Sequence, residues 1–233
     1  TCIDRIDGEY TDKRRFLIFD YCGNFEYFRA HKEGFESKET KTLSENIFEK
    51  QVRLISLLQE NDYAEEDYRN WRKVLSDTCL QQIRALNTEL TAVKLKLRYV
   101  EKYKKESAFA LLSEGDKGEL LQHIAPLIQV DDTDELAKRF DNFMYGMMLA
   151  WAEHTPAFKY AKKQLCGIAS ALEQKVSIPQ IKEKLDVIQS INSDDFWNAN
   201  DILLFEKIRE ELRELIKFLD SDAGKEPIIT RLT

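Results

Sequence analysis

Apolar residues recur at helical spacing along almost the whole chain after residue 42. Within each segment they step by three or four positions, which places them on one face of an α-helix. This spacing predicts about seven to nine helices packed as a bundle of antiparallel neighbours. The expected helical segments are about 43–60, 64–100, 119–128, 131–154, 156–175, 178–188 and 200–219, and the second is one long helix or two helices broken near Asn87-Thr88.

Several helix ends carry signals of their own. Thr42-Leu43-Ser44-Glu45 has the pattern of a capping box, in which a hydroxyl accepts from a backbone amide three residues later and the Glu side chain reaches back to the first residue. Thr133 stands among acidic residues where a helix begins, and we expect it to be the N-cap. These carboxylates interact favourably with a helix N-terminus, and the glycine hinge of a calcium loop is absent.

One segment near the N-terminus has a different pattern. Phe16–Phe19 is an unbroken apolar run, and Asp20-Tyr21 and the turn signal Gly23-Asn24 follow it. Such a run predicts a strand buried on both faces, which belongs in the middle of an α/β sheet. We expect residues 4–15 to be a polar loop, and the rest of the sheet to lie upstream in a larger protein.

The residues that follow this run carry a resemblance. The string from Phe19 to Phe28, FDYCGNFEYF, resembles the end of the second RecA-like motor domain in the R subunit of type I restriction-modification enzymes. Ala137–Asp141 and Ile208–Asp220 are similar to the C-terminal helical region of the same subunit. The resemblance implies a mainly α multi-helix bundle over 42–233, preceded at 1–41 by a strand-bearing remnant of a RecA-like α/β motor domain.

The resemblance also implies a function. In that family the parent protein uses ATP and Mg²⁺ to translocate and cleave double-stranded DNA, together with methylation and specificity subunits. The helical piece would couple or dock the motor to this core. We expect no catalytic residue and no cofactor in the chain itself, since it has no G-x-x-x-x-G-K-[ST] phosphate loop. An independent α-helical interaction adaptor and a module of another DNA helicase stay open.

The motor-domain motif comprises Asp20, Tyr21, Asn24 and Phe25. In nucleotide-binding α/β sheets, ligands gather at the carboxyl ends of strands, so Asp20-Tyr21 would lie near ATP or DNA. The alternative is that Asp20 and Asn24 only cap the strand and turn the chain.

A basic stripe is predicted in the second helical segment. Lys94, Arg98, Lys102 and Lys105 step by four, four and three, so they share one helix face. The opposite stripe, expected to face the core, is Leu90, Val93, Leu97 and Val100. The basic face is either solvated or contacts DNA phosphates or an acidic protein partner.

The motif Arg139-Phe140-Asp141 lies inside a predicted helix. Phe140 belongs to the apolar stripe and should be buried. Arg139 and Asp141 are two positions apart and cannot pair with each other. Each is available to another helix or domain, and the resemblance favours a role in tying the helices together or docking them.

Composition narrows the class of protein. The 233 residues are 43% hydrophobic and 33% charged, as in soluble helix-rich proteins, and a net charge of −7 argues against a surface that coats nucleic acid. Four scattered cysteines and three isolated histidines predict reduced thiols, no metal site and a cytoplasmic protein. The longest apolar run, about residues 143–152, is too short to cross a membrane.

Overall fold

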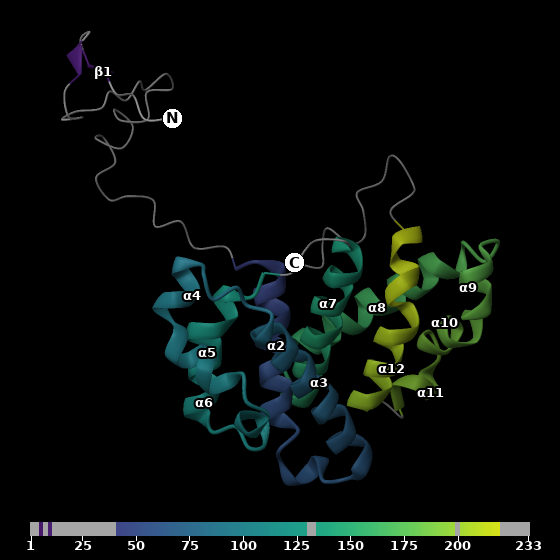
Figure 1. Cartoon of the computed structure of the whole chain (residues 1–233). Coiled ribbons are helices and arrows are strands. Elements are labelled where there is room, and N and C mark those ends of the chain that lie inside the picture. The colour runs from purple at the N-terminus through teal and green to yellow at the C-terminus, as the bar shows by residue number, and fades with distance from the viewer. Residues whose placement is uncertain (1–4, 7–8, 11–40, 130–133, 199–200, 220–233) are drawn as a thin grey trace, which may run out of the picture. The chain divides into compact units, whose positions relative to one another are not determined.

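The computed structural model describes residues 5–6, 9–10, 41–129, 134–198 and 201–219 (Figure 1). The chain separates into two compact units, Thr1–Thr40 and Lys41–Thr233, which are described one at a time.

In the first unit, β1 (Arg5–Ile6) and β2 (Glu9–Tyr10) form a short antiparallel ladder, with Arg5 opposite Tyr10 and Ile6 opposite Glu9. The expectation of a polar loop was therefore wrong at these four residues. A polar sequence does not exclude such pairing, because antiparallel strands can face water. The predicted strand Phe16–Phe19 lies outside the described residues. The assignment of this segment to a RecA-like motor domain has no support from the described part and stays a prediction.

The second unit is mainly helical, as the apolar spacing predicts. Its α-helices are α2 (Leu43–Leu57), α3 (Glu66–Arg84), α4 (Thr91–Leu95), α5 (Leu97–Tyr103), α6 (Glu114–Glu119), α7 (Glu135–Ala152), α8 (Ala157–Glu173), α9 (Pro179–Glu183), α10 (Leu185–Ile191), α11 (Asp194–Asn198) and α12 (Ile202–Leu212). Shorter 3₁₀ turns are η1 (Asn61–Tyr63), η2 (Glu106–Phe109), η4 (Ala125–Leu127) and η5 (Arg213–Phe218), and η3 (Leu120–Ile124) is a π-helix.

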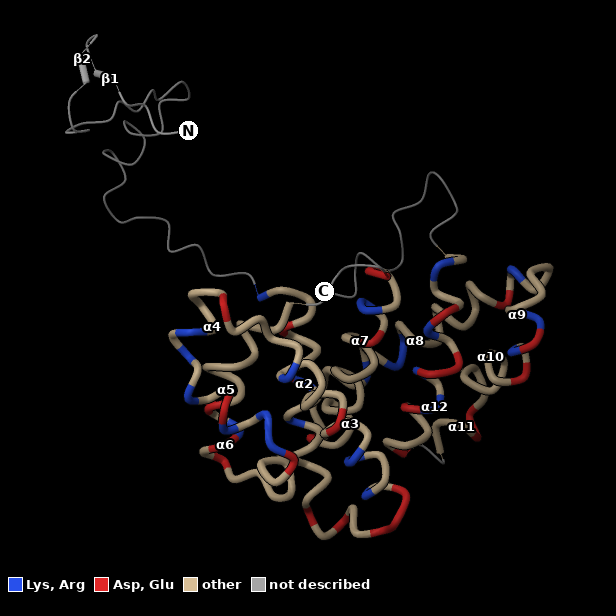
Figure 2. Tube along the Cα trace, viewed as in Figure 1, with Lys and Arg blue, Asp and Glu red and all other residues tan. Residues whose placement is uncertain are grey.

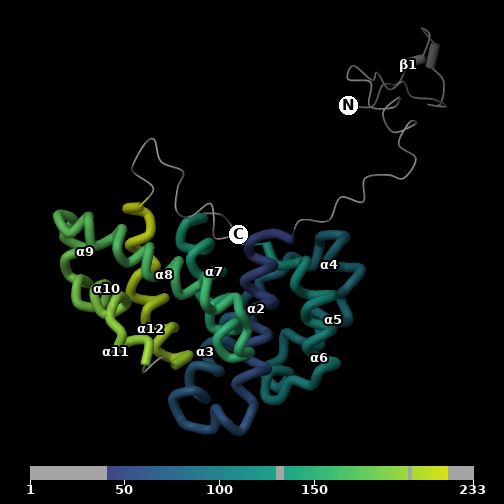
Figure 3. Tube along the Cα trace, turned by 180° about the vertical axis from the view of Figure 1, so that it is seen from behind, coloured from purple at the N-terminus to yellow at the C-terminus, as the bar shows by residue number. Residues whose placement is uncertain are grey.

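Helices α2 and α7 form the centre of this unit. Helix α3 and the η3–η4 segment pack against α2, while α8, α12 and η5 pack against α7. Figures 1 and 3 show from opposite sides that α4–α6 lie at one end and α9–α11 at the other.

One continuous apolar core holds these helices together. Phe48, Val52 and Ile55 of α2 are fully buried, as are Phe140 and Met144 of α7. Burying a side chain of this size contributes about 1.5–3 kcal/mol. At the start of α2, the Thr42 side chain accepts from the Glu45 amide at 3.1 Å, which is one half of the predicted capping box. The return contact from the Thr42 amide to the Glu45 side chain is not formed in this described helix.

The helices are more interrupted than expected. Of the two alternatives left open for the second segment, the structure has the break near Asn87: α3 ends at Arg84, and the Asn87 side chain accepts from the Glu89 amide, an Asx turn. Lys96 and Lys184, with φ near −110° and ψ near 15°, each divide a further expected helix. The described residues therefore contain eleven α-helices rather than seven to nine.

Helix α7 also begins differently from the prediction. Asp134 is its N-cap, and its side chain accepts from the Ala137 amide at 3.0 Å. The expected cap Thr133 was wrong, because any short polar side chain can satisfy this amide and spacing alone does not choose between neighbours.

Candidate functional site

The sequence predicts three sets of site residues, and two of them lie in the part of the chain that the structure describes. Asp20, Tyr21, Asn24 and Phe25 lie outside the described residues. The other two sets lie in the helical unit, at places that differ in burial and charge.

Helix α7 positions the motif Arg139-Phe140-Asp141. Arg139 donates to Glu135 one turn earlier, from Nε at 2.9 Å and from Nη2 at 2.5 Å. Phe140 is fully buried, as predicted. Asp141 accepts from Arg209 Nη1 at 2.7 Å and from Arg213 Nε at 2.8 Å. It therefore ties α7 to both α12 and η5.

These ion pairs form one network, here named the Asp141 junction: Asp141, Glu206, Arg209 and Arg213. Its carboxylates are buried, whereas the Arg213 side chain is 30% exposed. Arg209 also donates to both carboxylate oxygens of Glu206, each at 2.7 Å. The side chains of Arg209 and Asp141 are only 14% and 12% exposed. Burial disfavours the charged guanidinium, but the carboxylates of Glu206 and Asp141 outweigh it and raise the pKa of Arg209. Arg209 therefore stays charged although its side chain is largely shielded from water.

A half-buried cation, Lys50, contacts the residue that follows Asp141 on α7. Lys50 of α2 donates from Nζ to the Asn142 carbonyl at 2.9 Å and to Asn142 Oδ1 at 2.6 Å. Burial, and then the charge of Arg53, lower the pKa of Lys50 to about 8. A Cβ at Gly146 would lie 3.3 Å from this Nζ, so glycine leaves room for the ammonium group. Sequence reasoning missed Lys50, since its partner is 92 residues away.

The predicted basic stripe is not continuous. Val93 and Val100 are buried as expected. Leu90 and Leu97 are 52% and 40% exposed, so the prediction that they face the core was wrong. The cause is the break at Lys96, whose φ of −114° and ψ of 15° end α4 and start α5 in another direction. Leu90 also precedes α4 rather than lying within it.

One predicted cation is neutralised within the unit. Lys102 Nζ lies 2.8 Å from Asp116 Oδ1 and 2.8 Å from Glu119 Oε2. The Tyr103 hydroxyl lies 2.9 and 2.8 Å from the same two carboxylates, which share its single proton. The hydrogen bond from Lys102 and that from Ser113 hold the pKa of Asp116 well below its usual range. The signal for this acidic partner was Ser113-x-x-Asp116, which forms a full capping box at the start of α6.

The other cations line an outer edge of the unit, where Figure 2 shows Lys and Arg along α4 and α5. Lys94 pairs with Glu89 at 2.9 Å, and both side chains are exposed. Arg98 contacts the Tyr99 hydroxyl and lies 4.4 Å from the centre of that ring. Lys105 has no side-chain hydrogen bond or ion pair among the described residues. We name this surface the α4–α5 edge and define it as Leu90, Lys94, Leu95, Leu97, Arg98 and Lys105.

A hollow of about 440 Å³ opens beside this edge. Arg98 and Lys105 line it together with Lys102, and Ser107 and Ala108 form part of its wall. Glu101 also lines the hollow, but Lys104 pairs with it at 2.5 Å. Of the cations that line this hollow, Arg98 and Lys105 are the two that no carboxylate holds within the described part of the chain.

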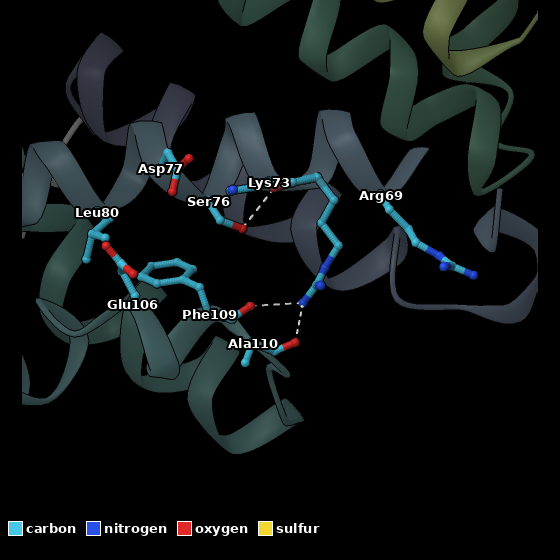
Figure 4. Close-up of a pocket in the computed structure, with 9 residues that line it drawn as sticks. Arg69, Lys73, Ser76, Asp77, Leu80, Glu106, Phe109 and Ala110 are labelled. Carbon is cyan, nitrogen blue, oxygen red and sulfur yellow. Dashed lines mark hydrogen bonds between the residues drawn. The ribbon is translucent and has the colours of Figure 1, made fainter. Parts of the chain in front are cut away.

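A second hollow, of about 300 Å³, lies between α3 and η2 (Figure 4). Arg72 spans it and donates to the carbonyls of Phe109 at 3.0 Å and Ala110 at 2.9 Å. Asp77 and Glu106 add carboxylates to the same walls. The guanidinium of Arg72 is already bonded to backbone carbonyls, and the other charges that line the hollow are of both signs. The hollow therefore does not indicate one class of ligand.

The described residues contain no cluster of three His, Cys, Asp or Glu side chains that could hold a metal ion. His123 stacks on Tyr99, with ring centres 3.9 Å apart. In the described part of the chain, no helix has the length and apolarity needed to cross a membrane.

Comparisons of the chain with protein-family models, with curated proteins and with solved structures find no match.

Proposed function

We propose that the chain is the C-terminal part of the R subunit of a type I restriction-modification enzyme. In this proposal its helical unit is a non-catalytic piece that docks the motor on the methyltransferase–specificity core. Stretches at the beginning, middle and end of the sequence resemble that subunit. A mainly helical second unit is consistent with the helical region that the resemblance implies.

One observation supports the proposal more than the others. The middle and last of these stretches lie far apart in the sequence, yet Asp141 of one pairs with Arg209 and Arg213 of the other. This contact gives a physical reason for the two stretches to occur together in one helical domain.

The test uses the purified chain and the methyltransferase–specificity complex from the same genome. We expect the two to co-sediment. We also expect the chain alone to show no ATP hydrolysis or DNA cleavage with Mg²⁺, ATP and duplex DNA, because it lacks a phosphate-binding loop. Failure to bind the core contradicts the proposal. So does an activity that disappears when a residue of the chain is substituted.

An independent α-helical adaptor is the second candidate, and the exposed leucines and cations of the α4–α5 edge favour it. The gene sequence upstream of Thr1 separates the two. A helicase-type arginine motif directly before Thr1 supports a motor protein, whereas its absence supports the adaptor.

A further inference from the structure

Large apolar side chains gather on the α4–α5 edge. Leu95, the last residue of α4, is 81% exposed, and Leu90 and Leu97 are exposed on either side of it. A single exposed leucine is ordinary, but three within eight residues concentrate apolar surface in one short segment of the chain. Val93, in the same short helix, is buried, so α4 has a packed side and an apolar outer side.

The cations around these leucines differ in how readily another molecule can reach them. Lys102 is held by Asp116 and Glu119. Lys94 has only the exposed Glu89, and such a pair is weak enough for a competing carboxylate to displace. Arg98 contacts Tyr99 rather than a carboxylate, and Lys105 makes no side-chain hydrogen bond or ion pair within the described part of the chain. Three cations therefore stand available around these leucines.

We propose that the α4–α5 edge docks an acidic segment of a partner protein that carries leucine-sized apolar side chains. Apolar residues of the partner would cover Leu95 and Leu97. A carboxylate beside them would enter the hollow lined by Arg98 and Lys105, which is large enough for such a side chain. Charge complementarity would orient the segment, and apolar burial would supply most of the affinity.

Duplex DNA fits this surface less well than an acidic peptide does. Affinity for a phosphate backbone grows with the number of free cations that contact it, and Lys102, in the middle of the stripe, is already neutralised. Exposed leucines have no complement on a phosphate backbone. A lipid surface also fits poorly, because an interfacial helix needs a long apolar face, whereas α4 spans Thr91–Leu95 only.

This inference goes beyond the proposed function and does not depend on it, because it is drawn from the surface chemistry of the α4–α5 edge. The whole chain can bind an acidic apolar segment whether or not it belongs to a restriction enzyme. Conversely, the chain can bind the methyltransferase–specificity core through another surface.

The experiment titrates the full chain with three probes and reads affinity by fluorescence anisotropy. The probes are a synthetic helical peptide of Glu and Leu, its counterpart of Lys and Leu, and a short DNA duplex. We expect the Glu/Leu peptide to bind, the Lys/Leu peptide not to bind, and the duplex to bind more weakly than the Glu/Leu peptide. Backbone amide shifts on binding should concentrate in residues 90–108.

Substitutions locate the surface. Leu95→Ser and the pair Arg98→Glu with Lys105→Glu should each weaken binding of the Glu/Leu peptide roughly tenfold. Matched controls are Tyr160→Ser on α8, which removes an exposed apolar side chain, and Lys182→Glu on α9, which reverses an exposed charge. Both controls should leave the affinity unchanged. Equal effects of control and test variants, or tighter binding of the duplex than of the peptide, would overturn the proposal.

Discussion

The Asp141 junction and the α4–α5 end of the helical unit use the same interactions in opposite surroundings. In both, a cation lies 2.7–2.8 Å from each carboxylate that it contacts. At the junction the paired Arg209 is 14% exposed, whereas Lys102 of α5 is 47% exposed. Water screens the exposed pairs of Lys102. At the junction, water cannot replace a partner that Arg209 loses. Contact distance therefore says little about stability until burial is known.

The largest effect is expected from Asp141→Ala. This change leaves Arg213 without its α7 partner and Arg209 with Glu206 alone, in a region with little water. Removing one member of a buried ion network costs about 3 kcal/mol of unfolding free energy. Urea denaturation followed by circular dichroism measures it.

The matched control is Glu135→Ala, which breaks the more exposed pair with Arg139 on the same helix. It should cost less than about 0.5 kcal/mol. Equal losses for the two variants would mean that burial does not distinguish the two kinds of pair.

The unfolding free energy should depend on pH through Lys50, a half-buried cation with no carboxylate at hydrogen-bond distance within the described residues. Burial lowers the pKa of Lys50 in the folded chain to about 8, below the 10.5 expected when the chain unfolds. Between these values the unfolded chain binds more protons, so the unfolding free energy should rise with pH, by up to about 1.4 kcal/mol per pH unit. Lys50→Met should remove this rise.

The measurement is the difference between the parent and the variant in urea denaturation from pH 7.5 to 10. The difference is needed because burial raises the pKa of Cys79, which lowers stability at alkaline pH in both proteins. Parallel stability curves would show that the Lys50 ammonium group is solvated in the folded chain.

The sequence predicts contacts between residues close together in the chain, and it does not predict contacts between residues far apart in it. The acceptance by Thr42 at the start of α2 and the burial of Phe140 depend on residues within a turn or two, and both are confirmed. The sequence also offered the break near Asn87 as one of two alternatives, and the structure has it. The partners of Asp141 lie 68 and 72 residues away, and no spacing rule reaches that far.

The basic stripe failed in part for a related reason. A helical projection assumes an unbroken helix, and one residue, Lys96, with non-helical dihedral angles, changes the direction of every side chain beyond it. Lysine is a good helix former, so its identity gives no warning of the break. The neutralisation of Lys102 likewise depends on α6 packing beside α5.

A smaller effect is expected from Lys102→Ala. Its ion pairs are partly exposed, and the Tyr103 hydroxyl still contacts Asp116 and Glu119, so the loss should stay below about 1 kcal/mol. A double-mutant cycle with Glu119→Gln should give a coupling that shrinks as salt is added. The cycle of Asp141→Ala with Arg213→Ala should give a larger coupling that salt changes little. Couplings of equal size and equal salt dependence would remove the distinction between the two regions.

The smallest effect on stability is expected from Leu95→Ser. Its side chain is mostly in water in the folded chain, so replacing it changes little between the folded and unfolded states, and the unfolding free energy should stay within about 0.5 kcal/mol of the parent. Val93→Ser is the internal comparison, because Val93 is buried two positions earlier in the same short helix. It should cost about 2 kcal/mol, since it removes packed methyl groups and buries a hydroxyl. Thermal unfolding of the two variants under one buffer condition measures both. If Leu95→Ser were as destabilising as Val93→Ser, Leu95 would be buried rather than exposed. The α4–α5 edge would then lack the exposed leucine that the docking of an apolar partner requires.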